Sequence, residues 1–173
     1  MPVRIQREDV DLSTEVALLR AGHPDVGAVV AFVGTVREMN GRDAVSQMEL
    51  EHYPGMTEAA LEAIVAQARA RWPLTDILVV HRIGPLQGCD QIVLTAVAAR
   101  HRGEAFAACE FVMDYLKTRA PFWKKEITGE GARWVEARDA DEANLAKWQA
   151  DRGCGKPGCS TPDSPARLSN QLM

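Results

Sequence analysis

Four stretches of apolar residues predict β-strands in the first hundred positions. Residues 26–36 read Val-Gly-Ala-Val-Val-Ala-Phe-Val-Gly-Thr-Val, and so continuous an apolar run predicts a buried central strand. Residues 45–52 instead alternate between apolar and polar side chains, as a strand with one exposed face does. With the turn residues between them, these two segments predict a hairpin with a long loop. The β-branched runs at 77–83 and 92–98 predict two further strands.

Apolar residues at helical spacing predict three helices among and after these strands. A short one covers residues 12–21, with Ser13 as a candidate cap. A second is capped by Thr57, and ends before Pro73, which cannot continue a helix. The third covers residues 103–119, where apolar side chains occupy most of the helix surface. Helices and strands therefore occur in one mixed order.

The last third of the chain changes character twice. Residues 122–127 and 133–137 predict two short strands, and Asp139 begins a capping-box pattern for a last helix that ends at Trp148. From residue 149 onward glycine, proline and serine dominate without periodicity, which is typical of a flexible tail. We therefore divide the chain into an N-terminal lead-in (1–25), one domain (26–148) and a tail (149–173).

Composition restricts the class of protein. With 173 residues, of which 46% are hydrophobic and 25% charged, the chain fits one globular domain. No apolar run approaches the roughly 20 residues that span a bilayer, and no secretory signal is apparent. We therefore expect a cytoplasmic protein. Its formal net charge of −4 argues against a dedicated nucleic-acid binder, which usually has a basic domain. In a reducing compartment its cysteines are thiols, with Cys109 packed in the core. Cys154 and Cys159 lack the second pair that a zinc site needs, so we expect no metal.

Two further groups of side chains are expected to be structural. His52 and His81 lie in predicted strands, where we expect them to be structural or exposed. Large aromatic side chains contribute strongly to cores. The tryptophans expected there are Trp72, Trp123, Trp134 and Trp148.

Four cations lie close together in residues 117–125 of this acidic chain. Pro121 lacks an N–H and disfavours the helical conformation at the residue before it, so the preceding helix should end near Arg119. Lys117 and Lys124 would then lie on different elements and approach one pocket from two sides. The alternative is a solvent-exposed helix end, because cations in a last turn suit the helix dipole.

A second basic group, Arg100-His101-Arg102, lies between a predicted strand and the next helix. Cations at a helix N-terminus oppose the dipole unless an anion binds there, where backbone N–H groups are also available. A lysine held among other cations is a candidate base or nucleophile. We therefore predict one basic pocket for a small anion, the alternative being side chains that simply reach solvent. Its expected members are Arg37, His101, Arg102, Lys117, Lys124 and Arg138.

Six motifs in this sequence resemble the large, catalytic subunit of molybdopterin synthase. They occur in the family's order across about residues 26–148, and so long an ordered match is hard to obtain by chance. The matching motifs are Gly-Thr-Val-Arg at 34–37, Leu-Glu-His-Tyr-Pro-Gly-Met at 50–56, His-Arg-Ile-Gly at 81–84, His-Arg at 101–102, Met-Asp-Tyr-Leu-Lys-Thr-Arg-Ala-Pro-Phe-Trp-Lys-Lys-Glu at 113–126 and Arg-Trp-Val-Glu-Ala-Arg at 133–138.

The resemblance implies a single α+β domain of the α/β-hammerhead type, with a mixed or antiparallel sheet and packed helices. It implies a homodimer at the centre of a heterotetramer, in which each large subunit receives the C-terminal tail of a small, ubiquitin-like carrier. That tail ends in a Gly-Gly thiocarboxylate. The implied reaction transfers sulfur from it to cyclic pyranopterin monophosphate, forming the dithiolene of molybdopterin in molybdenum cofactor biosynthesis, with no cofactor.

By the same resemblance, Lys117 and Lys124 are the catalytic lysines. The implied substrate site also includes Thr35, Val36, Arg37, His101, Arg102, Lys125, Glu126 and Arg138. One departure is Cys89, which stands where relatives commonly have a turn glycine and leaves the geometry of that turn open. The tail after Trp148 has no counterpart and does not end in Gly-Gly, so this chain is not also the carrier.

Two other classes of function use the same residues. In a non-catalytic anion- or nucleotide-binding module, the cations hold phosphate and nothing reacts. In an interaction scaffold, strand edges recruit partners and the lysines lie at a protein interface. Only turnover with carrier and pterin phosphate separates the enzyme from both.

Overall fold

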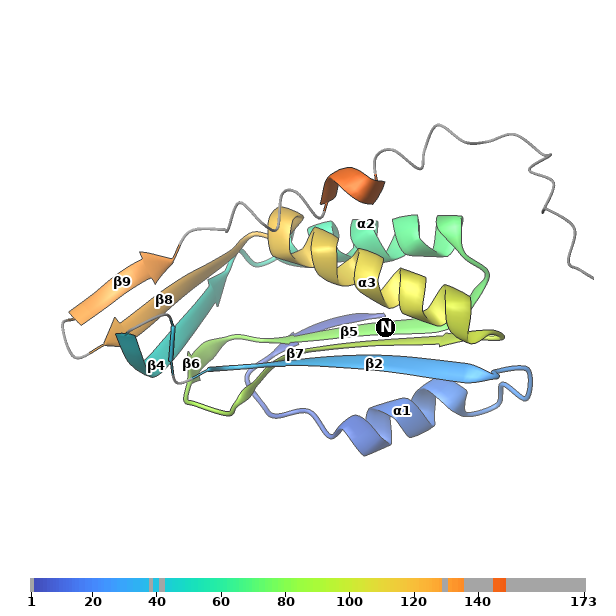
Figure 1. Ribbon diagram of the computed structural model, residues 1–173, viewed down its shortest axis with the longest axis horizontal. Helices are drawn as coiled ribbons and strands as arrows, with labels where there is room; N and C mark the ends of the chain where they lie inside the picture. Colours follow the sequence, from blue (N-terminus) through green and yellow to red (C-terminus); the bar gives the residue numbers. More distant parts are fainter. Residues whose placement is uncertain (1, 38, 41–42, 129–130, 136–144, 149–173) are drawn as a thin grey trace, which may run out of the picture.

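The computed structural model describes residues 2–37, 39–40, 43–128, 131–135 and 145–148. It shows a four-stranded sheet covered by helices and, beyond one end of it, a second sheet of five strands (Figure 1). The elements in chain order are β1 (Val3–Gln6), α1 (Leu12–Arg20), β2 (Ala28–Thr35), β3 (Met39–Asn40), β4 (Asp43–His52), α2 (Met56–Arg71), β5 (Leu74–Arg82), β6 (Gly84–Leu86), β7 (Gln91–Ala99), α3 (Arg102–Arg119), β8 (Phe122–Thr128) and β9 (Gly131–Val135).

The first sheet has the order β1-β5-β7-β2, with β1 parallel to β5 and the other pairs antiparallel. Helices α2 and α3 cover one face and α1 covers the other (Figure 1). Because both faces are covered, β7 is buried from Val93 to Ala99. One core layer lies between this sheet and α2 and α3, and a smaller one lies beneath α1. The predicted α+β class, with helices packed on a mixed sheet, is confirmed.

The prediction of a central position for the strand at 26–36 is wrong. Strand β2 is an edge strand, paired among the described strands with β7 alone, and Phe32 keeps 39% of its surface exposed. Its continuous apolar run has another cause: helices α3 and α1 lie over opposite faces of the sheet, so both sets of alternating side chains meet apolar neighbours. Apolar periodicity thus indicates which faces of a strand are buried, but it does not indicate whether both edges of the strand pair with other strands.

The predicted hairpin between 26–36 and 45–52 is also wrong, because β2 and β4 belong to different sheets. β2 instead pairs with β7 from Ala28↔Ala99 to Thr35↔Gln91. The alternating strand β4 joins the second sheet, of order β3-β4-β8-β9 with β6 also on β4. The strands predicted at 77–83, 92–98, 122–127 and 133–137 are present as β5, β7, β8 and β9.

The helix boundaries follow local chemistry, with two corrections. α1 is capped by Asp11 rather than Ser13, because the Asp11 carboxylate accepts from the backbone N–H groups of Ser13 and Thr14 at 3.0 and 3.3 Å. α2 begins after Gly55 rather than at Thr57. Gly55 has a φ of 82°, and its N–H donates to Glu58 Oε2 at 2.7 Å. The positive φ explains why glycine stands there.

The predicted capping box at Asp139 lies outside the described residues. Of the last helix the structure describes only residues 145–148, which are helical. Leu145 and Trp148 are buried in the main core, and Trp148 contacts Trp72 edge-to-face at 5.8 Å between ring centroids. The core prediction fails for two tryptophans of the second sheet: Trp123 and Trp134 are 47% and 55% exposed.

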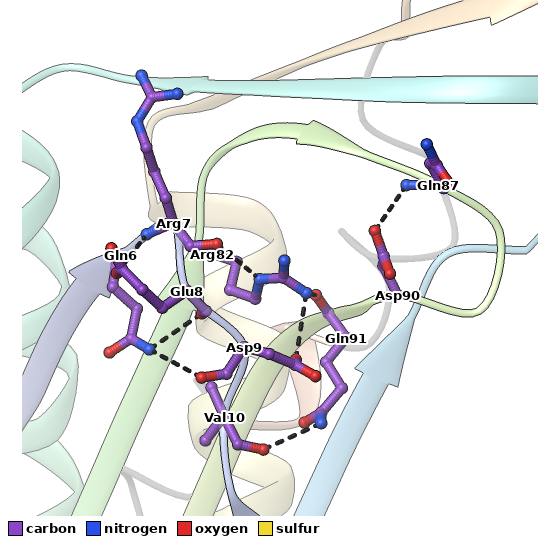
Figure 2. A network of polar contacts seen from close by, with 9 residues as sticks. All are labelled: Gln6, Arg7, Glu8, Asp9, Val10, Arg82, Gln87, Asp90 and Gln91. Atoms are coloured by element: carbon purple, nitrogen blue, oxygen red, sulfur yellow. Dashed lines mark hydrogen bonds and ion pairs between the residues drawn. The ribbon is translucent and has the colours of Figure 1, made fainter.

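A polar network fixes the chain segment between β1 and α1 against the first sheet (Figure 2). Arg82 donates to the carbonyls of Arg7 and Gln91 at 3.1 and 3.0 Å, and pairs with Asp9 at 3.2 Å. Gln91 in turn donates to the carbonyl of Val10 at 3.0 Å. The guanidinium therefore ties two strand ends to the N-terminal segment, which explains its structural value in the His-Arg-Ile-Gly motif.

Candidate functional site

The helix α3 ends where the sequence predicts. Arg119 is its last residue, and Ala120 turns to an extended conformation with φ −83° and ψ 126°. The N–H of Phe122 donates to the carbonyl of Ala120 at 2.9 Å, and β8 begins at once. Lys117 is thus exposed in the last turn of α3, whereas Lys124 lies partly buried on β8. Their predicted placement on two different elements is confirmed.

The break between α3 and β8 is fixed from α2. Thr57 is fully buried in the first turn of α2, and its hydroxyl donates to the carbonyl of Pro121 at 3.1 Å. The same hydroxyl accepts from the N–H of Tyr53 at 3.0 Å. A carbonyl next to a helix end has no partner in the helix itself. Here the side chain of Thr57, 64 positions away in the chain, supplies the missing partner.

Phe122, the first residue of β8, packs against a histidine of the first sheet. The ring of Phe122 stacks on His81 with centroids 3.7 Å apart and planes 14° apart. Burial lowers the pKa of His81 to about 4, so its ring is neutral near pH 7. His81 Nδ1 lies 2.8 Å from the carbonyl of Arg82. Because a carbonyl only accepts, that nitrogen carries the proton, which fixes the tautomer.

Neighbouring lysines of β8 point to opposite faces of the second sheet, because side chains alternate along a strand. Lys124 shares a face with Phe122, which packs against the main core. Lys125 instead lies over the exposed ring of Trp134, with 5.6 Å between Nζ and the ring centroid. The structure therefore separates Lys125 from the face on which Lys124 lies. Glu126 is also on β8.

The Thr35-Val36-Arg37 segment lies at the same end of the first sheet as the last turn of α3. Thr35 pairs with the start of β7, and α3 runs back over the sheet from the end of β7. Val36 is buried, and its N–H donates to the carbonyl of Asp90 at 2.9 Å. Arg37 follows as an exposed side chain. Two antiparallel changes of direction thus bring Arg37 to the end of the sheet at which Lys117 lies.

His101 and Arg102 lie at the opposite end of the same sheet, so one chain does not assemble the predicted pocket. Both are exposed where α3 begins, beside the start of β2. The eight residues of β2 place about 25 Å between this end and Arg37, at roughly 3.3 Å per residue. The prediction treated the ends of two strands as neighbours, which holds for parallel strands only. β2 and β7 are antiparallel.

The remaining candidate residues lie in the core or outside the described residues. Arg138, Cys154 and Cys159 lie outside the described residues. Cys109 is confirmed as a core thiol: it is buried, and burial raises its pKa to about 11. Within the described ranges no cluster of three potential metal ligands was found, and no helix there is long and apolar enough to cross a membrane.

Cys89 occupies a left-handed backbone position, with a φ of 71°. Its N–H donates to the carbonyl of Val36 at 3.0 Å, which joins the turn before β7 to the segment that carries Arg37. In the same turn the carboxylate of Asp90 accepts from the N–H of Gln87 at 2.8 Å. The departure from a turn glycine therefore leaves the turn closed.

Sequence reasoning missed two residues that shape this region, Thr57 and His81. The partner of Thr57 is remote in the chain, and no local pattern indicates it. His81 did carry a signal, because it interrupts a β-branched apolar run that becomes buried on both faces. A polar residue in such a run is expected to have a specific partner.

Comparison with known proteins identifies relatives over most of the chain. Residues 5–119 match the family model described as "MoaE protein". A molybdopterin synthase catalytic subunit from Ralstonia nicotianae is 64% identical over 146 residues, which cover 84% of this chain and 83% of the relative. The resemblance inferred from the six motifs is thereby confirmed.

Solved structures share the fold. The molybdopterin biosynthesis MoaE protein from Burkholderia ambifaria MC40-6 superposes with a TM-score of 0.74 and 60% identity, covering 85% of this chain and 97% of that one. A complex of subunits 1 and 2 of molybdopterin-converting factor from Helicobacter pylori 26695 superposes with a TM-score of 0.66, covering 80% of this chain and 92% of its own. At 18% identity that second likeness shows the fold alone.

Proposed function

This chain belongs to the MoaE protein family, and we propose that it is the catalytic subunit of a molybdopterin synthase. The observation that carries the proposal is the 64% identity to a molybdopterin synthase catalytic subunit over most of both chains. The geometry supports it independently, since two lysines lie on either side of a helix-to-strand break that buried contacts hold in place.

The proposed reaction transfers sulfur from a carrier thiocarboxylate to cyclic pyranopterin monophosphate. Each transfer forms one carbon–sulfur bond of the dithiolene in place of an oxygen substituent of the pterin carbon. It also breaks the acyl carbon–sulfur bond of the carrier, and water supplies the oxygen of the carboxylate in which the carrier is released. A carbonyl or thiocarboxylate centre under attack develops negative charge on oxygen, which a nearby ammonium group stabilises. Lys117 and Lys124 are the proposed sources of that charge and of the protons exchanged. We leave Lys125 out of this set, because it lies on the other face of β8.

The substrate phosphate calls for cations that do not react. Arg37 is available at the lysine end of the sheet, and guanidinium groups bind phosphate through paired hydrogen bonds. His101 and Arg102, at the far end, cannot join it within one chain. We therefore propose that they act on the site of a second copy.

The edge strand β2 offers a way to bring those two ends together. It carries no charge, and its residues are nonpolar up to Thr35, where the register with β7 shifts, although exposed strand edges are usually protected by charges. If two copies pair their β2 edges antiparallel about a two-fold axis, the start of one β2 meets the end of the other. His101 and Arg102 of one copy then face Arg37 of its partner. This homodimer is the proposed active form.

The partner of that dimer is a small carrier protein with a Gly-Gly thiocarboxylate. The name of the Ralstonia relative, a catalytic subunit, implies a further subunit in that enzyme. The structure from Helicobacter is itself a complex of two subunits. A heterotetramer of two large and two small subunits, like the cytoplasmic location, stays a prediction.

Turnover tests the proposed function directly. The purified chain is mixed with thiocarboxylated carrier and the pterin phosphate, and dithiolene product is measured by mass spectrometry. We expect product from the wild-type chain and a loss of about 100-fold or more in kcat for Lys117→Ala. Lys147→Ala is the matched control, because Lys147 pairs with Glu110 and Asp114 on the helix surface.

The outcomes separate the three functions. Phosphate binding without any product from the wild-type chain would favour the non-catalytic anion-binding module. Carrier binding without phosphate binding or product would favour the scaffold. Full turnover by Lys117→Ala would contradict the catalytic role assigned to Lys117, but not the proposed function.

A further inference from the structure

The chain segment that joins α3 to β8, and with them the two lysines, is short. Helix α3 ends at Arg119, and the ladder with β4 begins at the pair His52↔Phe122. Ala120 and Pro121 alone belong to neither element. The angle between α3 and β8, and with it the relative position of Lys117 and Lys124, therefore depends on how these two residues are held.

Thr57 makes the polar contact that holds this link. Its hydroxyl donates to the carbonyl of Pro121 at 3.1 Å, and Thr57 itself is fully buried. Proline has no N–H, which leaves its carbonyl as the one backbone group through which Pro121 can be held by hydrogen bonding.

The hydroxyl is not needed to cap its own helix. The N–H of Gly55 donates to Glu58, and the N–H of Thr57 donates to the carbonyl of Tyr53 at 2.9 Å. The hydroxyl instead accepts from the N–H of Tyr53 at 3.0 Å while it donates to Pro121. Because a hydroxyl has one proton, the bond from Tyr53 leaves that proton directed toward Pro121. The orientation of the donor is thus fixed.

We propose that Thr57 is a positioning residue of the sulfur-transfer site, which holds Lys117 and Lys124 at their reactive separation through the carbonyl of Pro121. The inference rests on the proposed function. Thr57 does not reach the substrate, and it acts only on the backbone that joins the two lysine-bearing elements. Small displacements of catalytic groups reduce the rate strongly, by about 100-fold for 1 Å.

Three variants test this proposal. Thr57→Val keeps the shape and removes the hydroxyl, Thr57→Ser keeps the hydroxyl, and Thr95→Val is the control. Thr95 is another fully buried threonine, whose hydroxyl contacts the sulfur of Met113 at 3.2 Å within the core. It removes a buried hydroxyl without touching the break between α3 and β8.

We expect Thr57→Val to lower kcat about tenfold or more, while KM for the pterin phosphate changes less than twofold. Thr57→Ser should recover most of the rate, and Thr95→Val should keep it even where its melting temperature falls as much. A wild-type kcat in Thr57→Val would overturn the proposal. So would a Thr57→Ser variant as slow as Thr57→Val, since the hydroxyl would then not be the cause.

A second readout is independent of turnover. In the full chain with ¹³C-dimethylated lysines, Thr57→Val should shift the NMR signals of both Lys117 and Lys124, whereas Thr95→Val should shift neither. If the wild-type chain makes no product, the proposed function fails, but these signals still show whether Thr57 sets the lysine geometry. Unmoved signals in Thr57→Val would overturn the positioning role.

Discussion

The two ends of the first sheet differ in how firmly their cations are held. At one end, β2 finishes, α3 finishes and β8 begins, and buried groups fix the backbone there: Thr57 on Pro121 and His81 on Phe122. At the other end, α3 begins with His101 and Arg102 exposed to solvent. The first end therefore fixes the backbone that carries the two lysines proposed to react. The second presents positive charge to solvent at the opposite end of the sheet from Arg37.

The difference is a consequence of antiparallel order. A strand pair that runs in opposite directions separates its two carboxyl ends by the length of the sheet, so cations that follow β2 and β7 cannot meet. A second copy reverses the direction again. Substitutions at one end at a time should therefore have separable effects, largest at the lysine end.

The largest effect is expected at the lysine end, from the two faces of β8. Lys124→Ala should lower kcat about 100-fold, because it removes a charge that stabilises the transition state. Lys125→Ala should stay within about threefold, because its side chain lies over Trp134 on the other face. Single-turnover rates with preformed carrier thiocarboxylate provide the measurement. Equal losses in the two variants would show that strand alternation does not define the site.

The same end should also lose stability in acid. The folded pKa of His81 is lowered to about 4, from an ordinary value of 6.5, so the unfolded chain binds the proton more readily. The neutral ring makes its full contribution to the free energy of unfolding above pH 6.5, and this contribution is lost as the pH falls toward 4. The loss reaches about 3 kcal/mol. Thermal unfolding of wild type and His81→Phe from pH 7 to 4.5 measures it.

His81→Phe keeps an aromatic ring beside Phe122 and removes the titrating group. Its stability should therefore vary less with pH than that of the wild type across this window. The contribution of His81 would be refuted by parallel curves for the two proteins.

A smaller effect is expected at the far end. Arg102→Ala should raise KM for the pterin phosphate about tenfold and leave kcat nearly unchanged, because a charge-assisted hydrogen bond is worth about 1.5–3 kcal/mol. Arg100→Ala is the matched control, as an equally exposed neighbour outside α3. Initial rates over a range of substrate concentrations decide between them. If Arg102→Ala and Arg100→Ala had the same KM for the pterin phosphate, Arg102 would not belong to the substrate site.

The smallest effect concerns the turn that holds the Arg37 segment. Cys89 has a φ of 71°, a conformation that costs a side-chain-bearing residue about 1–2 kcal/mol and glycine little. After the greater entropy loss of glycine, Cys89→Gly should stabilise the chain by about 0.5–1 kcal/mol. Denaturant unfolding measures this gain, with Cys89→Ala as a control that keeps the strain. Destabilisation by glycine would mean that the thiol makes a favourable contact.

Much of this structure was predictable from local patterns. Pro121 indicated the end of α3 because proline acts on its own and the preceding residue, and apolar periodicity located most of the strands. Which strands pair was not predictable in the same way. β2 and β4 are close in sequence but lie in different sheets, since pairing depends on contacts between elements that are far apart in the chain.

The candidate site shows the same limit. The lysines on α3 and β8 follow from local sequence and from resemblance. Thr57 was expected to cap its own helix, because only the folded chain brings Pro121 beside it. Likewise, Arg37 and Arg102 were expected to be neighbours, because the sequence does not state that their strands run in opposite directions.

The central claim is that each active site combines the lysine end of one copy with the His101–Arg102 end of another. Co-expression of a Lys117→Ala chain with a chain carrying His101→Ala and Arg102→Ala tests it most directly. In a mixed dimer one composite site would contain all the defects and the other none. With the pterin phosphate well below its KM, where loss of His101 and Arg102 lowers the rate, random pairing should then restore activity to about one quarter of wild type. Activity no higher than that of either parent alone would contradict a site shared between two copies.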